Sequence, residues 1–117
     1  MIHRNKRPDD LHFGKYNGLG GRLEANEDVA SGMRREILEE SGLVAESMAL
    51  RGTISWPGFG KKGEDWFGFI FRIESWHGEA STGNHEGTLE WVPLVSLSTL
   101  SLWPSDRFFL PMVFDDD

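Results

Sequence analysis

Apolar residues recur at helical spacing in the segment that follows Asp28, and they form one stripe on a helical wheel. The stripe consists of Val29, Met33 and Ile37. Asp28 offers a side-chain oxygen to cap the first turn, and Gly42 supplies a C-terminal stop. The pattern therefore predicts a helix over residues 29–41 whose apolar face packs on a sheet.

Two segments rich in β-branched and aromatic residues follow this helix. They are SMALRGTISW, residues 47–56, and DWFGFIFRIESW, residues 65–76. The sequence PGFGKKGE between them is typical of an exposed turn, so we expect two neighbouring antiparallel strands. The segment TLEWVPL, residues 88–94, predicts one more short strand before Pro93.

The two ends of the chain carry weaker patterns. Residues 6–21 contain several turn formers and are expected to form a loop with short extended pieces. Near the C-terminus, Pro104 and Ser105 are typical of a helix start, and Pro111 is expected to shorten or kink that helix. Its apolar set is Phe108, Phe109, Met112 and Val113. Together the elements predict an α+β fold, a sandwich in which a mixed β-sheet is flanked by two helices.

Composition and charge narrow the classes of function. With 117 residues the chain fits a single domain, residues 1–117. No apolar run approaches the roughly 18 residues that cross a bilayer, and no signal-peptide pattern opens the chain. The lack of cysteine excludes thiolate chemistry and is typical of a cytoplasmic protein. The formal net charge of -7 has the wrong sign for unaided binding of long nucleic acid, so we expect neither nucleic acid nor membrane as a partner.

The predicted helix concentrates like charge on one side. Glu36, Glu39 and Glu40 occupy an arc of roughly 100° beside the apolar stripe, and Glu40 lies at the edge of the stripe. Carboxylates placed where a helix meets a sheet lose water and need compensating charge. Two interpretations fit this pattern. Arg35 and nearby lysines neutralise an ordinary solvated acidic face, or the carboxylates form a site for Mg²⁺ or Mn²⁺ that also takes substrate phosphates.

The segment GGRLEANEDVASGMRREILEESGL, residues 20–43, fills every fixed position of the pattern G-x5-E-x7-R-E-U-x-E-E-x-G-U, in which U is a bulky aliphatic residue. The fixed positions hold Gly21, Glu27, Arg35, Glu36, Ile37, Glu39, Glu40, Gly42 and Leu43. This pattern is the Nudix box, and the chain therefore resembles a Nudix hydrolase. The resemblance implies the α/β/α sandwich of that family.

The resemblance also implies a reaction. Nudix enzymes hydrolyse a nucleoside diphosphate linked to another group, with water attacking phosphorus and divalent ions offsetting the charge. By the family pattern, Glu36, Glu39 and Glu40 hold the metal ions, and either Glu36 or Glu39 deprotonates or orients the water. Arg35 is expected to orient these carboxylates through charge-assisted hydrogen bonds. Gly21 is expected to let the backbone approach a metal ion or phosphate closely.

Polar residues around this set complete the predicted site. Glu27 is expected to support its loop by bonding to backbone amides or to Arg35. A further acidic residue commonly completes Nudix sites, and Glu86 lies in the expected loop, with plain loop surface as the alternative interpretation. The neighbouring His85 is expected to be exposed to solvent. Lys15 and Arg22, close to the glycines of the box, are candidate phosphate contacts.

Two flanking segments, KYNGLGGRLE and LWPSDRFFLP, resemble the oxidised-purine nucleoside triphosphatases of the MutT type. Asn17 matches the asparagine that reads the base, Trp103 the indole that stacks on it, and Asp106 the second of two acids. A purine needs an apolar plane for its face and fixed polar groups for its edge. The alternative is that Trp103 belongs to an ordinary core. Three positions differ from the residues of that branch: Tyr16, Leu19 and Ser105.

The leading hypothesis is a divalent-metal-dependent pyrophosphohydrolase that converts a nucleoside triphosphate, with an oxidised purine nucleotide as the candidate, into a monophosphate and pyrophosphate. The alternatives are a Nudix hydrolase for ADP-ribose, a nucleotide sugar or a dinucleoside polyphosphate, and a nucleotide-binding module without turnover. Only twenty residues precede Gly21, so the first N-terminal strand of the family is expected to be missing. We expect either a natural short variant or a homodimer in which a second copy completes the sheet edge.

Overall fold

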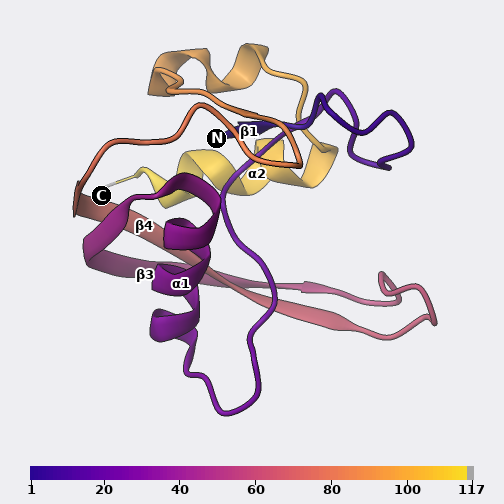
Figure 1. Cartoon of the computed structure of the whole chain (residues 1–117). Helices are drawn as coiled ribbons and strands as arrows, with labels where there is room; N and C mark the ends of the chain where they lie inside the picture. Colours follow the sequence, from indigo (N-terminus) through magenta and orange to yellow (C-terminus); the bar gives the residue numbers. More distant parts are fainter. Residues whose placement is uncertain (116–117) are drawn as a thin grey trace.

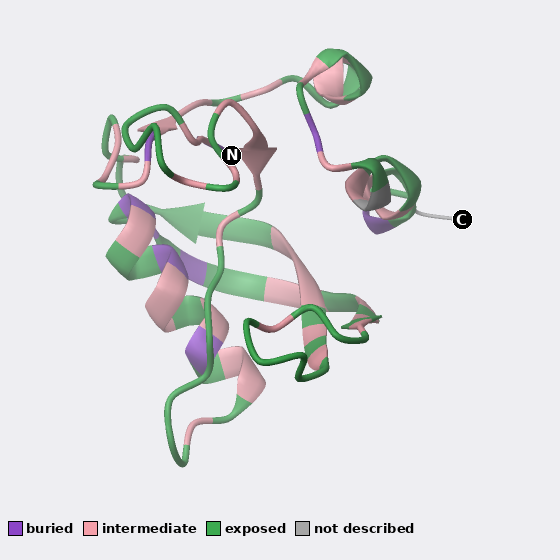
Figure 2. Ribbon diagram, turned by 90° about the vertical axis from the view of Figure 1, so that its right-hand side faces the viewer, coloured by how far each residue is buried: buried purple, intermediate pink, exposed green. Residues whose placement is uncertain are grey.

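The secondary structure alternates short and long elements along the chain. The computed structural model describes residues 1–115, apart from the side chain of Ser105, which lies outside the described set. The order is β1 (Ile2–His3), β2 (Tyr16–Asn17), α1 (Val29–Ser41), β3 (Val44–Trp56), β4 (Trp66–His77), β5 (Thr88–Leu89), the 3₁₀ helix η1 (Leu94–Thr99) and α2 (Pro104–Val113). Figure 1 shows α1 crossing the β3–β4 hairpin at the end where β3 begins, and Figure 2 shows α2 on the opposite side of that hairpin. The predicted α+β fold class is confirmed.

Helix α1 has the bounds that the sequence predicts. The Asp28 carboxylate accepts the N–H of Ser31 at 2.8 Å, and Gly42 ends the helix with a left-handed φ of 79°. The helix packs its apolar face on β3, where Figure 2 shows buried residues on both elements. The buried cluster consists of Ile37, Leu43 and Ala45, with Met33, Met48, Ile73 and Ala80 packed against it.

Strands β3 and β4 form the predicted antiparallel hairpin. Their register runs from Val44 opposite His77 to Trp56 opposite Trp66. The turn is closed by Asp65, whose Oδ1 accepts the N–H of Gly58 at 2.8 Å. Strand β3 begins already at Val44, earlier than predicted, because the chain leaves the left-handed end of α1 directly into extended backbone.

The remaining strands form a separate sheet with the order β2-β1-β5. In residues 1–115 the paired strands are antiparallel and are divided between two sheets, where the sequence predicts one mixed sheet. Strand β5 covers only Thr88 and Leu89, shorter than the predicted segment 88–94, because its partner β1 pairs through two residues. After Pro93 the chain enters η1, which the sequence pattern did not predict.

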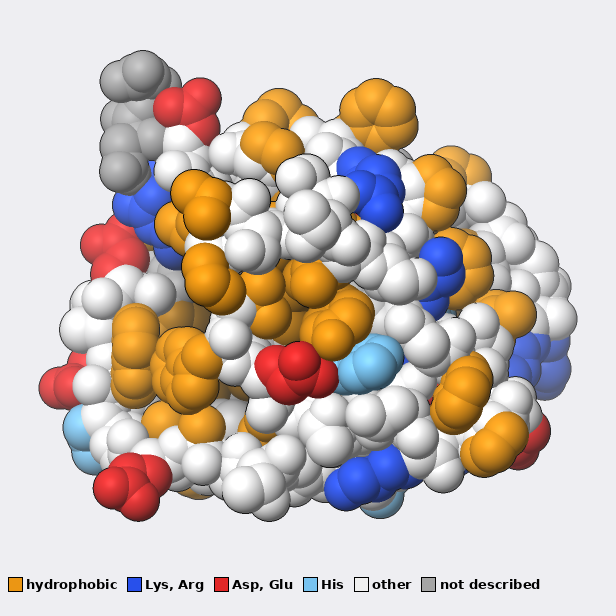
Figure 3. All heavy atoms as spheres, turned by 90° about the horizontal axis from the view of Figure 1, so that it is seen from above, with side chains coloured by type: hydrophobic (Ala, Val, Ile, Leu, Met, Phe, Trp, Pro, Cys, Tyr) orange, Lys and Arg blue, Asp and Glu red, His pale blue; other side chains and the backbone are white. Residues whose placement is uncertain are grey.

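Helix α2 begins at Pro104, as predicted, and continues past Pro111 to Val113, so the helix does not end at this proline, and the alternative of a kink stays a prediction. Pro111 lies in the last turn of α2, where only two helical residues follow it. The apolar set of this helix divides between core and surface, since Val113 is 6% exposed and Phe108 is 79% exposed. Figure 3, seen from above, shows hydrophobic side chains in several groups on that face of the molecule. Within residues 1–115, no helix is long and apolar enough to cross a membrane.

Candidate active site

Arg35 on α1 is the centre of a hydrogen-bond network. Its Nε and Nη2 donate to the two carboxylate oxygens of Glu27 at 2.8 and 3.0 Å, and Nη2 also donates to the carbonyl oxygen of Arg22 at 2.9 Å. Glu27 also accepts the N–H of Glu24 at 3.0 Å. These hydrogen bonds, that of Arg35 above all, lower the pKa of Glu27. The expected support of the loop by Glu27 is confirmed, and the contacts tie this loop to the helix.

The same guanidinium also holds two acidic side chains of the helix. Nη1 of Arg35 donates to Glu36 Oε1 at 2.8 Å and to Glu39 Oε2 at 3.1 Å. The expected contacts of Arg35 with these carboxylates are therefore present. The side chain of Glu36 is 16% exposed, whereas that of Glu39 is 56% exposed. Glu39 thus lies on the solvent side of α1, and the prediction that it sits in the water-poor seam between helix and sheet is wrong.

Gly21 leaves the space that the Glu36 carboxylate occupies. A Cβ built on Gly21 would lie 2.5 Å from Cδ of Glu36, closer than side-chain atoms approach one another. The sequence predicts that Gly21 admits a metal ion or phosphate; in the structure the backbone approaches the carboxylate itself. Arg35 on one side and Gly21 on the other therefore define the position of Glu36.

Glu40 carries the most perturbed carboxyl of the predicted site. Burial raises the pKa of Glu40 to about 7, and repulsion from Glu86 and Glu36 adds to the effect. The N–H of Gly20 donates to Glu40 Oε2 at 3.1 Å and acts in the opposite direction, as does the charge of Arg4. The three carboxylates thus share a local surplus of negative charge.

Glu86 reaches this region because its loop is fastened to the end of α1. The side-chain amide of Asn84 donates to the carbonyl oxygen of Glu40 at 3.1 Å, and Asn84 Oδ1 accepts the N–H of Glu86 at 2.8 Å. Arg4 Nη1 lies 3.5 Å from Glu86 Oε2. Sequence reasoning missed Asn84 and Arg4. Asn84 had a usable signal, since asparagine in a glycine-containing loop is typical of an Asx turn, in which its side chain bonds the backbone two residues on; Arg4 had none.

The donor chemistry of these residues fits a hard divalent cation. Glu36 Oε1 accepts a hydrogen bond from Arg35, whereas Oε2 of the same carboxylate accepts none from residues 1–115. Burial, together with repulsion from Glu86 and Glu36, disfavours the charged form of Glu40, and a bound cation would offset both effects. In the described part of the chain, no three His, Asp or Glu side chains are gathered tightly enough to hold one ion. A cation would therefore require side-chain rotations that bring the carboxylates together.

Trp103, the predicted stacking residue, lies beside the loop that precedes β2. The indole Nε1–H donates to His12 Nδ1 at 2.7 Å, and Lys15 Nζ lies 5.4 Å from the centroid of the Trp103 ring. Burial raises the pKa of Asp106, and the nearby His12 opposes that shift. Asn17 follows Tyr16 in β2. The backbone N–H of Tyr16 donates to the carbonyl oxygen of Ser101 at 2.9 Å, which brings β2 beside the segment that leads into Trp103. Lys15 thus contacts the candidate base side and not the acidic residues of the box.

A cleft of about 670 Å³ lies between the glycine loop, α1 and the hairpin. Gly21, Arg22 and Glu36 contribute its polar side. The guanidinium of Arg22 lies 4.8 Å from the centroid of the Trp66 ring, a cation–π arrangement that leaves the expected phosphate contact of Arg22 a prediction. The aromatic side of the cleft consists of Trp56, Trp66, Phe67, Phe69 and Phe71.

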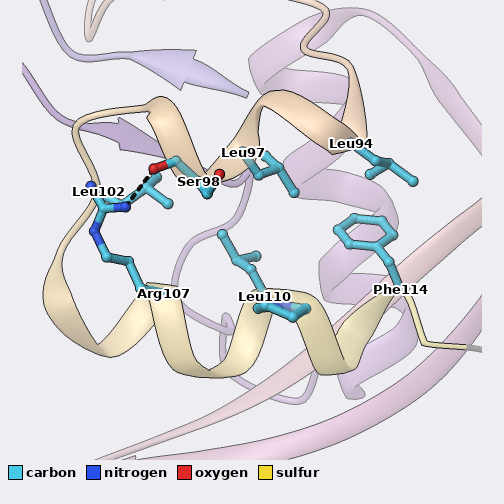
Figure 4. Close-up of a pocket in the computed structure, with 8 residues that line it drawn as sticks. Leu94, Leu97, Ser98, Leu102, Arg107, Leu110 and Phe114 are labelled. Atoms are coloured by element: carbon cyan, nitrogen blue, oxygen red, sulfur yellow. Dashed lines mark hydrogen bonds between the residues drawn. The ribbon is translucent and has the colours of Figure 1, made fainter.

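A smaller cavity of about 210 Å³ lies between η1 and α2 (Figure 4). Its lining is mostly apolar, and its Arg107 donates hydrogen bonds to the carbonyl oxygens of Ser98 and Leu100 at 2.7 Å each. None of the predicted site residues lines this cavity. His85 is exposed, as expected.

Both the structure and the sequence of the chain are similar to those of known proteins. The structure matches the mutator MutT protein of Bacillus halodurans with a TM-score of 0.83 and 25% identity, covering 98% of this chain and 73% of that one. Oxidized purine nucleoside triphosphate hydrolases of Mus musculus and Danio rerio are 33% and 30% identical over 100 residues, which is 86% of this chain. The aligned part is 63% of each relative, so the chain spans less than two thirds of their length.

The fold and the site define a class of protein: an α+β domain whose acidic helix carries an arginine, Arg35, that holds the neighbouring carboxylates. The family model described as NUDIX domain matches residues 1–113. The chain therefore belongs to the Nudix family.

Proposed function

We propose that the protein is a divalent-metal-dependent pyrophosphohydrolase that converts a nucleoside triphosphate into a nucleoside monophosphate and pyrophosphate. The observation that carries this proposal is the surplus of negative charge shared by Glu36, Glu40 and Glu86. Burial raises the pKa of Glu40 to about 7, and repulsion from the other two carboxylates adds to the effect. A divalent cation removes that surplus, and a polyphosphate is the natural second ligand of such a cation.

The acidic residues have different parts in this proposal. Glu36, Glu40 and Glu86 are the ligands for Mg²⁺ or Mn²⁺, and the exposed Glu39 joins them by rotating about its side chain. When bound, the ion neutralises phosphate charge and activates water. Arg35 holds Glu36 in a fixed orientation, because its Nη1 lies 2.8 Å from Glu36 Oε1. The position of Gly21 against this carboxylate keeps a side chain out of the site.

An oxidised purine is the base that we propose for the substrate. Two relatives with sequence identities of 33% and 30% carry the name oxidized purine nucleoside triphosphate hydrolase. In this chain the indole of Trp103 offers a plane for stacking, and Asp106 lies partly buried beside it with a raised pKa. The carboxyl of Asp106 is placed to meet the polar edge of a base whose face stacks on the indole.

The proposed reaction is tested by phosphate release. Purified protein is incubated with Mg²⁺ and a panel of ordinary and oxidised nucleoside triphosphates, with and without added inorganic pyrophosphatase. We expect orthophosphate only in the presence of pyrophosphatase, and fastest for an oxidised purine. Orthophosphate without the coupling enzyme would contradict pyrophosphate as the product.

A second candidate function is favoured by the cleft of about 670 Å³ beside Glu36. Its aromatic wall and Arg22 suit a further ring or sugar attached to a diphosphate, as in ADP-ribose, a nucleotide sugar or a dinucleoside polyphosphate. These compounds are added to the same panel. In their reactions alone, alkaline phosphatase replaces pyrophosphatase as the coupling enzyme, and the comparison of rates separates the two functions. Faster turnover of any of them than of the triphosphates would favour the second candidate.

A further inference from the structure

The loop that precedes β2 holds a histidine that the Nudix box does not contain and that contacts Trp103, a candidate base residue. His12 Nδ1 accepts the indole N–H of Trp103 at 2.7 Å, a short and well-formed hydrogen bond. We propose that His12 is a positioning residue that fixes the Trp103 indole for base stacking and thereby sets substrate specificity, an inference that rests on the proposed function.

The imidazole contacts the indole at its edge. The two ring centroids are 5.4 Å apart and the ring planes lie at 81°, so His12 takes the N–H edge of Trp103 and not a face. Lys15 Nζ is 5.4 Å from the indole centroid and donates to the carbonyl oxygen of Leu102 at 3.4 Å. A hydrogen bond at the edge restricts rotation of the indole without occupying the plane on which a base stacks.

His12 is itself held by a partly buried ion pair. The backbone N–H of His12 donates to Asp10 Oδ1 at 3.0 Å. Asp10 Oδ2 accepts from Nε of Arg4 at 2.8 Å and lies 2.8 Å from Nη2 of the same guanidinium. The side chain of Asp10 is 8% exposed and that of Arg4 is 16% exposed. The backbone closes the loop as well, because the N–H of Lys15 donates to the carbonyl oxygen of His12 at 2.8 Å. These contacts hold the backbone of His12, so the imidazole extends toward Trp103 from a fixed point of the loop.

The hydrogen bond also defines the chemical form of His12. Since Nδ1 accepts, the ring proton of the neutral imidazole lies on Nε2. Substituting His12 by a residue without an acceptor leaves the indole N–H without its partner. The asparagine side chain carries an oxygen close to the position of Nδ1, so His12→Asn retains an acceptor, whereas His12→Phe keeps the ring volume and removes it.

The test combines kinetics with the indole resonance of Trp103, assigned by its loss in Trp103→Phe. We expect His12→Phe to raise KM for purine triphosphates about two- to tenfold with little change in kcat, the range of one hydrogen bond. His12→Asn should keep KM within about twofold of the wild-type value. In the free protein, His12→Phe should move the Trp103 Nε1–H resonance upfield, and His12→Asn should keep it near the wild-type position. In the Trp103→Phe background, His12→Phe should no longer change KM.

Two results would overturn the inference and are distinguishable from each other. If Trp103→Ala raises KM but His12→Phe changes neither KM nor the indole resonance, the positioning role is wrong while base stacking stands. If His12→Phe moves the resonance but Trp103→Ala leaves KM unchanged for every nucleotide, the base-stacking part of the proposed function fails, and the role of His12 in specificity fails with it.

Discussion

A Cβ on Gly21 would lie 2.5 Å from Cδ of Glu36, so the glycine of the loop and the acid of the helix share one small space. Glu36 does not simply swing away from such an atom, because its Oε1 is held by Arg35 at 2.8 Å. The glycine at the start of the Nudix box is therefore a condition for the orientation of the carboxylate, and the loop and the helix depend on each other.

The first prediction concerns this contact. Gly21→Ala should lower kcat about 100-fold, because a displacement near 1 Å in a catalytic group costs that much. The melting temperature should change little, since Gly21 lies at the surface. Gly18→Ala is the matched control, because a Cβ there meets no atom within 4 Å. Equal kcat for both variants would show that the position of Glu36 is not important for turnover.

The second prediction concerns Arg35, which holds Glu27 and Glu36. Arg35→Lys should lower kcat about 10- to 100-fold, since lysine cannot form the two parallel hydrogen bonds to Glu27 and also hold Glu36. Arg34→Lys is the control on the same helix, because Arg34 is exposed and makes one long hydrogen bond of 3.4 Å to a backbone oxygen. Steady-state kinetics decide, and comparable losses in both variants would point to a general effect on α1.

The third prediction follows from Glu40. Its folded-state pKa of about 7 lies above the ordinary value of 4.5, so the folded state favours the protonated form. This contribution to stability is fully present below about pH 4.5 and is lost as the pH rises through about 7. Each pH unit of the interval is worth about 1.4 kcal/mol, which the partial exposure of Glu40 reduces to about 1–2 kcal/mol in total.

Urea unfolding of metal-free protein between pH 5 and 8 measures this effect. Wild-type protein should lose more stability over this range than Glu40→Gln, in which the group cannot ionise. Mg²⁺ at pH 8 should restore stability to the wild type more than to the variant, and the variant should have lost turnover by orders of magnitude. Parallel pH curves for the two proteins would contradict the assignment of the raised pKa to Glu40.

The fourth prediction separates a base contact from a core residue. Trp103→Ala should raise KM about tenfold or more, the scale of one base–aromatic stack, with a smaller change in kcat. Phe108→Ala on α2 is the control, because Phe108 is 79% exposed. Thermal unfolding is measured alongside. A large loss of melting temperature in Trp103→Ala with unchanged KM would assign the indole to the core.

Local signals in the sequence were sufficient to predict α1 and the hairpin. Asp28 caps the helix and Gly42 ends it, and both act on backbone atoms a few residues away. The candidate acids of the box could be predicted because they stand at fixed spacings within one short segment. The exposure of Glu39, at 56%, could not, because it depends on how α1 is rotated against β3. Homodimerisation at the sheet edge stays a prediction, which a monomer in concentrated sedimentation runs would contradict.

Contacts between distant segments explain what sequence reasoning missed. Asn84 binds the end of α1 at the carbonyl oxygen of Glu40, across 44 residues of chain. His12 and Trp103 are 91 residues apart and meet through one hydrogen bond. Neither pair carries a spacing that a motif would reveal, since each depends on the packing of loops against helices.

The central claim is that the acidic residues of α1 and Glu86 hold divalent ions against a polyphosphate. Electron paramagnetic resonance of Mn²⁺ tests it most directly, because the signal of the free aqueous ion falls when protein binds it. With a non-hydrolysable nucleoside triphosphate analogue present, the wild-type protein should reduce the free signal well beyond the analogue alone, and Glu36→Gln combined with Glu40→Gln should weaken that binding at least about tenfold. Identical Mn²⁺ titrations for the wild type and the double variant would contradict the account.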